Sequence, residues 1–426
     1  MVSTEQKYGP AATAGSTAKL VNSQARARPP ARGQGRRKIN FAGGLEQGYW
    51  VAKRTWRKSA DGLMLAGARL LRFLAIPYAM ATRVNWEECR KNRWLVFLDH
   101  LYIFFRLGYY PDNYGQCRLW EKDRREWKYY WGSGYDPRIT GLLHRKKVQR
   151  KDCLVLFEDK EVCYQLCLSH GLPLPRQYGV LDSAEDLPAR IRGIFAMEDV
   201  DRVLLKPVGG AGGKGICLVE RVDGELLVRR VLDSTGIPLE QFAVSTRCVI
   251  QEKVRQHPRL NAISSRSLNT IRMVTLMTPE EEIIPVGAYL RFGTGESFVD
   301  NICAGGCSVA LDLGTGESDT VVHNQRSHVQ TLLFATKGAV SQFGVPYWEQ
   351  VIGLAKRVQA CFAPFSRILG SDIGITPSGP VLIEINFGYD NTGLESTCGA
   401  ILKNGAIRRA FLDYGIISHR LLDSER

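Results

Sequence analysis

Two carboxylates and one carboxamide in the C-terminal part of the chain are residue types that bind a divalent cation. Glu384 and Asn386 end an apolar run typical of a β-strand, and Asp372 lies on another such run upstream, with turn formers between them that predict a hairpin. Since strand side chains alternate between faces, Glu384 and Asn386 should share one face. Ile383 and Ile385 should then point into a core. Hard oxygen ligands held this way suit Mg²⁺ that also contacts nucleotide phosphates, so Asp372, Glu384 and Asn386 are the predicted metal ligands.

A glycine-rich loop lies between two strand-like runs far upstream of this hairpin. Lys206 ends the first run, and residues 209–215 contain five glycines. Glycine allows positive φ angles and lets backbone N–H groups approach phosphate oxygens closely. The pattern is neither a Walker loop nor a Rossmann fingerprint, because a second β-type run follows it instead of a helix. We therefore predict a hairpin flap over phosphates, with Lys206 as a phosphate contact; a hairpin tip that binds no ligand is the alternative.

The strand-like run from 248 to 254 ends in polar residues that could meet the edge of a nucleotide base. The Glu252 carboxylate can accept a hydrogen bond from an exocyclic amine, and neighbouring backbone groups can contact ring nitrogens. Taken alone, this run is an ordinary strand end. Its position between the glycine loop and the predicted metal hairpin supports the interpretation that it contacts a base.

In this order, the segments resemble the ATP-grasp superfamily, and within it the sugar-transfer-associated ATP-grasp group linked to bacterial polysaccharide biosynthesis. The resemblance covers roughly residues 152–403. It implies an α+β fold in which two α+β subdomains clamp ATP. The segments that carry it are Asp159-Lys160 before a helix that ends in a Gly-Leu-Pro-Leu-Pro stretch, Lys206-Pro207 with the glycine loop, Gln251-Glu252-Lys253, Asn269-Thr270-Ile271-Arg272, and Asp372 with Glu384-Ile385-Asn386.

The resemblance also implies a role for each candidate residue, with ATP and Mg²⁺ as the cofactors. Lys160 and Lys206 would bind phosphates. Arg272 would stabilise charge on the transferred phosphoryl group or on an acyl phosphate, and Arg272 and Lys206 would be the catalytic residues. The remaining expected nucleotide contacts are Gly209, Gly210, Gly212, Gly213 and Lys214 in the flap, and Gln251, Glu252, Lys253 and Val254 around adenine.

The chain departs from ligases of the D-alanine–D-alanine type at the ribose contact. Those ligases carry a second glutamate soon after the adenine glutamate, whereas this neighbourhood here is the PRLN segment at 258–261, so no ribose residue is assigned. Asp300 and Asn301, followed by paired glycines, predict a loop. The resemblance puts this loop opposite the metal hairpin, where it could position the acceptor; a tight turn without a ligand is the alternative.

The function implied by the resemblance is that of an ATP- and Mg-dependent carboxylate–amine ligase that works through an acyl phosphate. Its partners would be a small-molecule or sugar-linked carboxylate and an amine, and it would modify a sugar or polysaccharide precursor. A phosphotransferase that acts on a sugar hydroxyl is one alternative, because it would use the same ATP site. A non-catalytic nucleotide-binding scaffold associated with a membrane is the other.

Charge and composition divide the chain into four predicted regions. Residues 1–150 carry a net charge of +18 and residues 151–426 a net charge of −4, which together give the +14 of the whole chain. Residues 1–58 are basic and poor in apolar side chains, which predicts a disordered tail. Residues 59–150 predict a basic, aromatic-rich helical domain, residues 151–254 the small ATP-grasp subdomain with the flap, and residues 255–426 the large subdomain with the metal site.

The helical domain allows two interpretations. Apolar residues from 63 to 78 form a helical stripe that Pro77 should end or kink, and residues 94–106 predict a second, buried helix. One interpretation is a helical domain packed on the catalytic core; the other is a basic, aromatic face that rests on an anionic membrane surface. The aromatic residues between Tyr109 and Tyr135 could likewise bind sugar rings or form an interface between domains.

Composition also limits the expected location and partners. The sequence contains no run of about 20 uncharged apolar residues of the kind that could span a bilayer. The eleven cysteines form no CxxC pair, and we expect free thiols in the cytoplasm, with the inner face of the membrane as a further candidate location. Nucleic acid is not an expected partner, because no aromatic residue interleaves with the basic residues of the 19–38 segment.

Overall fold

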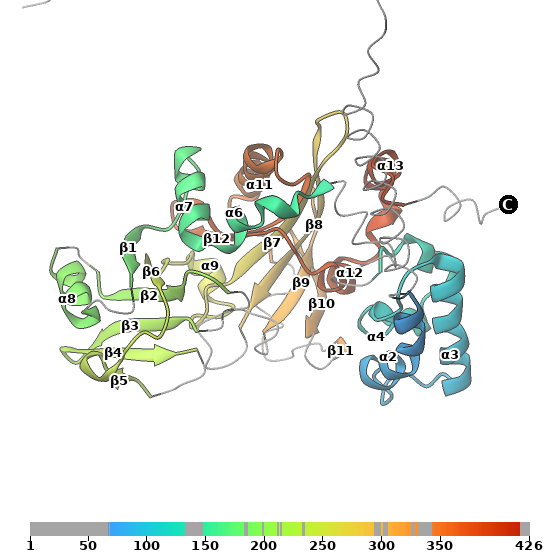
Figure 1. Cartoon of the computed structure of the whole chain (residues 1–426), viewed down its shortest axis with the longest axis horizontal. Helices are drawn as coiled ribbons and strands as arrows, with labels where there is room; N and C mark the ends of the chain where they lie inside the picture. The colour runs from blue at the N-terminus through green and yellow to red at the C-terminus, as the bar shows by residue number, and fades with distance from the viewer. Residues whose placement is uncertain are drawn as a thin grey trace, which may run out of the picture. The chain divides into compact units, whose positions relative to one another are not determined.

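The computed structural model describes residues 67, 69–132, 148–182, 186–197, 200–210, 213, 215–231, 235–293, 300, 306–324, 329–330 and 343–417. The disordered tail predicted for residues 1–58 lies outside these described residues. Helices come first along the described chain, a six-stranded and then a seven-stranded sheet follow, and two helices end it (Figure 1).

Proline separates the first two helices, as the sequence predicts. Residues 69–74 are helical, the chain turns at Ala75, and α2 (Ile76–Arg83) follows. Pro77 lies in the first turn of α2, where backbone N–H groups make no hydrogen bond within the helix, so proline is tolerated there. The next helix, α3 (Arg93–Tyr102), begins at Asn92 and continues as the π-helical turn η1 (Ile103–Leu107). Shorter helical pieces follow: α4 (Asn113–Gln116), η2 (Leu119–Glu121) and η3 (Arg124–Tyr129).

Five of the aromatic residues considered as a sugar surface are core residues instead, whereas Tyr110, Trp120 and Tyr129 are half-buried and Tyr135 lies outside the described residues. Tyr109, Tyr114, Trp127, Tyr130 and Trp131 are all buried. The rings of Tyr114 and Trp127 meet nearly edge to face, with centroids 5.8 Å apart. Buried rings cannot stack on a sugar, so these five residues stabilise the helical segment and its contacts.

The second helix predicted over residues 94–106 is present, but it is buried on one side only. One side of α3 is buried through Val96 and His100, but Trp94 and Leu98 are 63% and 40% exposed, and Phe105 in η1 is 61% exposed. The sequence is apolar on both sides of this helix, so its pattern alone could not indicate which side lacks a partner.

The first sheet is covered on one face by α8 (Leu187–Met197). Its strands are all paired antiparallel in the order β1 (Gln177–Leu181), β6 (Cys248–Glu252), β2 (Arg202–Pro207), β3 (Cys217–Val222), β4 (Glu225–Arg230) and β5 (Ile237–Pro238). Val203 and Leu205 pack in the core with Ile191 of α8. Since strand side chains alternate, Leu204 and Lys206 point to the opposite face.

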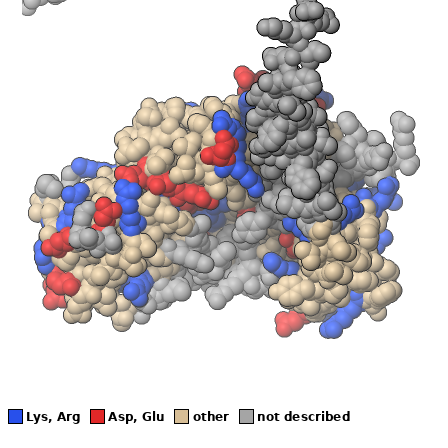
Figure 2. Space-filling model, in the orientation of Figure 1, with Lys and Arg blue, Asp and Glu red and all other residues tan. Residues whose placement is uncertain are grey.

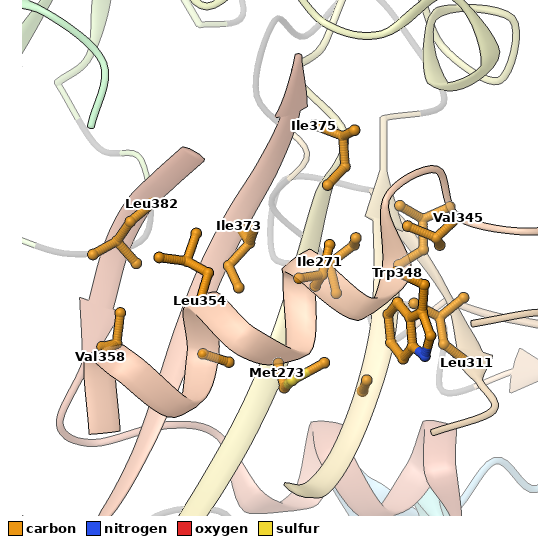
Figure 3. Close-up of a cluster of buried hydrophobic side chains, with 14 of the residues drawn as sticks. Ile271, Met273, Leu311, Val345, Trp348, Leu354, Val358, Ile373, Ile375 and Leu382 are labelled. Carbon is orange, nitrogen blue, oxygen red and sulfur yellow. The ribbon is translucent and has the colours of Figure 1, made fainter. Parts of the chain in front are cut away.

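The second sheet is covered on one face by α11 (Trp348–Phe362). Its antiparallel order is β11 (Val329–Gln330), β10 (Ser318–Asn324), β9 (Cys307–Leu311), β8 (Ile283–Phe292), β7 (Thr270–Met277), β12 (Ile368–Thr376) and β13 (Gly379–Asn386). Figure 3 shows Leu354 and Val358 of α11 beside Ile373 and Leu382 of the sheet. The neighbouring Asp372 therefore points away from α11.

Two C-terminal helices, α12 (Asn391–Cys398) and α13 (Gly405–Asp413), cover part of the other face of this sheet. Val274 of β7 packs there with Phe411 of α13. Glu395 of α12, which is 1% exposed, accepts hydrogen bonds from the backbone N–H groups of Trp131 (2.6 Å) and Gly132 (3.1 Å). This buried carboxylate ties the helical segment to the second sheet.

Three further helices flank the sheets: α6 (Val155–Glu158), α7 (Lys160–Ser169) and α9 (Pro258–Asn261). The mixture of helices with two antiparallel sheets confirms the predicted α+β class. Within the part of the chain that the structure describes, no helix is long and apolar enough to cross a membrane.

Candidate nucleotide and metal site

The hairpin of β12 and β13 brings the three predicted metal ligands to one face. Asp372 is opposite Glu384 in the antiparallel register, and Gly370 is opposite Asn386. Directly paired residues of a sheet share a face, so all three polar side chains lie on the side away from α11. Across the other edge of β12, Asp372 is opposite Arg272 of β7.

A β-bulge corrects the predicted alternation of β13. The register shifts between Asp372 and Ile373, which gives β13 one extra residue at this point. Leu382 and Ile385 are consequently the buried residues of β13, whereas Ile383, which the sequence places in the core, is only half-buried. Bulges of this kind often lie next to active sites, where they re-aim a side chain.

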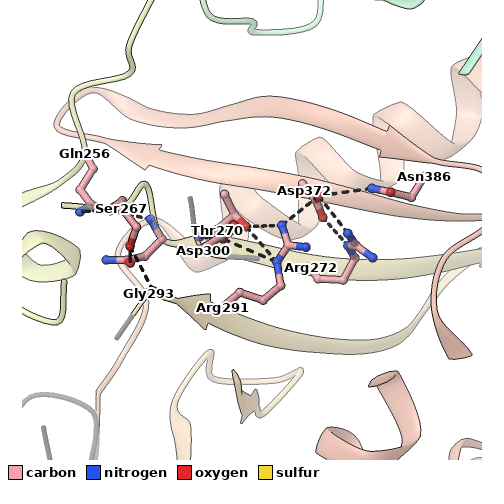
Figure 4. Close-up of polar contacts among 10 residues, drawn as sticks. Gln256, Ser267, Thr270, Arg272, Arg291, Gly293, Asp300, Asp372 and Asn386 are labelled. Atoms are coloured by element: carbon pink, nitrogen blue, oxygen red, sulfur yellow. Dashed lines mark hydrogen bonds and ion pairs between the residues drawn. The ribbon is translucent and has the colours of Figure 1, made fainter. Parts of the chain in front are cut away.

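Asp372 is buried between two arginines (Figure 4). Arg272 donates from Nε to Oδ1 and from Nη2 to Oδ2 at 3.0 Å. Arg291 Nη2 lies 2.9 Å from Oδ2, and Asn386 Nδ2 donates to the same oxygen at 3.3 Å. Burial by itself would raise the pKa of Asp372, but the two guanidinium groups outweigh it and hold the pKa below its ordinary value. Asp372 is therefore an anion at neutral pH.

Arg291 is a site residue that sequence reasoning missed. It stands opposite Thr270 in the register of β7 and β8, and its Nη2 donates to Thr270 Oγ1 at 2.6 Å. Its Nε lies 3.6 Å from Asp300 Oδ2. The only signal in the sequence is one arginine near the end of an apolar strand, which by itself is typical of a surface residue. Strand pairing is what brings it to Asp372.

Asp300 fixes the start of β7 through its carboxylate. Oδ2 accepts hydrogen bonds from Thr270 N at 2.9 Å and from Thr270 Oγ1. Burial raises the pKa of Asp300, and the charge of Arg291 opposes that shift. The loop residues 301–305 lie outside the described residues, so acceptor positioning by this loop stays a prediction.

Lys206 connects the first sheet to the metal hairpin. Its Nζ donates to Gln251 Oε1 at 2.6 Å on the face away from α8. Burial lowers the pKa of Lys206 to about 8; the carboxylate of Glu384 opposes this shift, and the ammonium group of Lys160 adds to it. Charge interactions weaken with distance, so Glu384 and Lys160 are both near neighbours of Lys206. The charged side chains of the two sheets are thus close enough to influence one another.

Lys160 holds the described part of the glycine loop. Asp159 caps α7 by accepting from two backbone N–H groups of its first turn, which places Lys160 at the helix start. Lys160 N donates to Val208 O at 3.1 Å, and Lys160 Nζ donates to Gly210 O at 2.7 Å. The flap prediction requires positive φ angles, and the loop has them at Gly210, Gly213 and Gly215. Gly209 is also described, while Gly212 and Lys214 lie outside the described residues.

The predicted adenine contacts lie where β6 ends. Glu252 Oε2 accepts from Arg176 N at 3.0 Å, and Glu252 N donates to Arg176 O at 2.8 Å. Burial lowers the pKa of Lys253, and the next contribution comes from Arg202 at the start of β2. The backbone of Lys253 and that of Val254 are the groups that could face a base.

The residues present fit a magnesium ion. Two carboxylates and one carboxamide converge on a single sheet face, and oxygen donors of these types are what Mg²⁺ prefers. Oδ2 of Asp372 takes the contacts from Arg272 Nη2, Arg291 and Asn386, whereas Oδ1 accepts from Arg272 Nε. A carboxylate has about four lone-pair directions, so Oδ1 keeps one for a cation.

Comparison with known proteins gives a family. The model of the sugar-transfer associated ATP-grasp family matches residues 143–404. Similar solved structures include N5-carboxyaminoimidazole ribonucleotide synthetase from Thermotoga maritima (11% identity, TM-score 0.31, 58% of this chain and 51% of that chain) and the D-alanine-D-alanine ligase from Coxiella burnetii (12%, 0.33, 67% and 68%). An ATP-grasp RimK domain protein from Sphaerobacter thermophilus is also similar (14%, 0.33, 60% and 70%).

These structural likenesses are distant. The chain spans about half the length of the Thermotoga maritima synthetase, and the TM-scores are low, so no substrate follows from them. The search among curated proteins gives no match.

Proposed function

This chain belongs to the sugar-transfer associated ATP-grasp family, and from this premise we propose that it is an ATP- and Mg-dependent carboxylate–amine ligase that modifies a sugar or polysaccharide precursor. One observation carries the proposal. Lys206 of the first sheet lies near Glu384 of the second sheet. Glu384 is opposite Asp372 in the register of β12 and β13, and two arginines keep Asp372 in its anionic form. Phosphate-binding, metal-binding and charge-stabilising groups therefore belong to one site.

The basic residues bind the nucleotide phosphates. Lys206 is held by Gln251, and Lys160 is held by the carbonyl of Gly210, so both ammonium groups are positioned before the nucleotide arrives. A preorganised charge loses less conformational entropy when its ligand binds than a mobile side chain does. The glycine loop would place backbone N–H groups over the phosphates. Mg²⁺, held by Asp372, Glu384 and Asn386, would supply neutralisation of phosphate charge.

The reaction has two steps in this proposal. A carboxylate oxygen of the substrate attacks the γ-phosphorus of ATP, the bond from that phosphorus to the β–γ bridging oxygen breaks, and ADP leaves. The amine then attacks the acyl carbon, the C–O bond to phosphate breaks, and one proton goes to solvent as the amide forms. Arg272 and Arg291 face the developing negative charge, and fixed donors of this kind typically stabilise a transition state by about 3 kcal/mol each.

The test is a product assay with a hydroxylamine trap. The enzyme is incubated with Mg·ATP, a panel of uronic acids or acidic sugars, and a panel of amines, and ADP release is followed. For acids that support ADP release, hydroxylamine then replaces the amine. An acyl phosphate gives a hydroxamate, which supports the ligase. A stable phosphate ester on a sugar hydroxyl would identify a phosphotransferase instead, and nucleotide binding without ADP release across the panel would indicate a scaffold.

A further inference from the structure

Large apolar side chains are exposed together on consecutive helices of the helical segment. They lie on residues 70–78 and 94–105 and are between 40% and 69% exposed: Leu70, Leu71, Leu74, Tyr78, Trp94, Leu95, Leu98 and Phe105. Elsewhere in the described residues such exposure occurs at scattered positions on α6, α7 and β5 and at Tyr347. A concentration of this kind on one segment indicates a binding surface, whereas single exposed side chains need no explanation.

The two helical stripes form one continuous surface. The ring of Phe73 lies 5.6 Å from that of Phe105 and 5.9 Å from that of Phe104, between centroids. Phe104 and Ile76 form a small buried cluster beneath them. These ring contacts join the helix of residues 69–74 to η1, so the two exposed stretches of the chain are neighbours.

Arginines accompany the exposed apolar side chains on these helices. Arg69 lies over the Phe104 ring at 5.6 Å and Arg93 over the Trp86 ring at 5.1 Å, and Arg72 and Arg106 belong to the same helices. Residues 69–83 contain no acidic side chain. Figure 2 shows Lys and Arg side chains (blue) spread over the segment that carries α2 and α3. We call the surface formed by Leu70, Leu71, Leu74, Tyr78, Trp94, Leu98 and Phe105, with Arg69, Arg72, Arg93 and Arg106, the apolar-basic face.

The single acid of α3 and η1 does not reach this face. Asp99 is fully buried, and its carboxylate accepts from Tyr114 Oη at 2.7 Å and pairs with Arg124 at 2.5 Å and with Lys91. Its charge is thus neutralised on the core side of the helix. The outer side is left with apolar and positively charged groups.

We propose that the apolar-basic face binds the surface of an anionic membrane. Apolar side chains on amphipathic helices enter the boundary between head groups and acyl chains, and bordering arginines pair with anionic head groups. Trp94 and Tyr78 have an apolar body with a polar tip, which suits this boundary. Because no described helix can cross a bilayer, the contact lies along the membrane surface. The proposal concerns the helical segment and does not depend on the reaction proposed above.

A second copy of the chain is a poorer occupant of this face. A symmetric dimer would bring the same patch of both copies together, so Arg69, Arg72, Arg93 and Arg106 of each copy would share one interface. Like charges placed opposite each other disfavour association. A lipid surface supplies the opposite charge for the exposed arginines Arg69, Arg93 and Arg106 at once.

The test is co-sedimentation of the full chain with vesicles. Phosphatidylcholine vesicles are compared with vesicles that also contain phosphatidylglycerol. We expect binding to the anionic vesicles only, and weaker binding as salt is raised. The double substitution Leu71→Glu and Leu74→Glu should lower the vesicle affinity at least tenfold, because each leucine contributes roughly a tenfold gain when buried. Arg69→Glu with Arg106→Glu should lower it by about fivefold per arginine.

A matched control distinguishes binding through this face from non-specific adsorption by any exposed apolar side chain. Leu168 on α7 is 52% exposed, comparable with Leu71 and Leu74, and Leu168→Glu should leave vesicle binding unchanged. All substituted side chains are on the surface, and the far-UV circular dichroism and thermal midpoint of each variant verify its fold. Three results would overturn the proposal: no binding to anionic vesicles at low salt, equal binding by wild type and the leucine variants, or a concentration-dependent dimer that the leucine variants abolish.

Discussion

The affinity for Mg·ATP should fall as pH rises, because Lys206 loses its proton close to neutral pH. Burial lowers the pKa of Lys206 from 10.5 to about 8 in the nucleotide-free protein. The ammonium form can pair with phosphate oxygens, and the neutral amine cannot. About three quarters of the molecules carry the proton at about pH 7.5, and about one tenth carry it at about pH 9. The affinity should therefore fall about eightfold over this range, close to 1.3 kcal/mol.

Calorimetric titration with a non-hydrolysable ATP analogue and excess Mg²⁺ measures this effect. Phosphate groups titrate near pH 6, so the ligand charge stays constant over the range. Bound phosphates favour protonated Lys206, and binding at about pH 8.5 should take up most of one proton, seen as a difference between buffers of unequal ionisation heat. Lys206→Arg should flatten the profile, because guanidinium keeps its proton. An Arg variant with the same slope as wild type, or binding without proton uptake, would refute this reasoning.

Substitutions at four further positions test packing and the arginine pair. Gly115→Ala should lower the thermal midpoint by several degrees, since the added Cβ would lie 1.7 Å from Arg83 O. At Gly353 in α11 an added Cβ meets nothing within 4 Å, so Gly353→Ala should stabilise the folded protein by about 0.5 kcal/mol. Glu395→Ala should lower the free energy of unfolding, measured with denaturant, by about 3 kcal/mol, because two buried N–H groups lose their acceptor. Glu395→Gln should lower it less. Arg291→Gln should slow turnover at least tenfold yet tighten Mn²⁺ binding measured by electron paramagnetic resonance, since it removes a cation from beside Asp372.

The period-two alternation and the turn residues were enough to predict the hairpin of β12 and β13. Asp372 and Glu384 needed only that pattern to be placed on paired strands, and the glycine loop was predicted between β2 and β3 for the same reason. The alternation failed at Ile383, because a bulge adds one residue without any local sequence signal. Arg291 was missed because its contact with Asp372 depends on the register of three strands.

Burial in the helical segment was the least predictable feature. Tyr114 and Trp127 are aromatic residues among charged neighbours, a pattern that suits a binding surface and a core equally well, and tertiary packing decides between them. Trp94 and Val96 lie two positions apart on one apolar helix, yet the first is exposed and the second is buried. When a helix is apolar on both sides, its sequence does not indicate which side is buried; that depends on which neighbouring elements pack against it.

Metal-dependent nucleotide binding by a hairpin variant tests the central claim most directly. Mn²⁺·ATP affinity is measured for wild type, for the double variant Glu384→Ala with Asn386→Ala, and for Glu349→Ala, which removes an exposed acid from the first turn of α11 as a control. We expect the double variant to lose metal-dependent binding by about a hundredfold while Glu349→Ala matches wild type. Wild-type affinity and ADP release in the double variant would contradict a metal site on this hairpin.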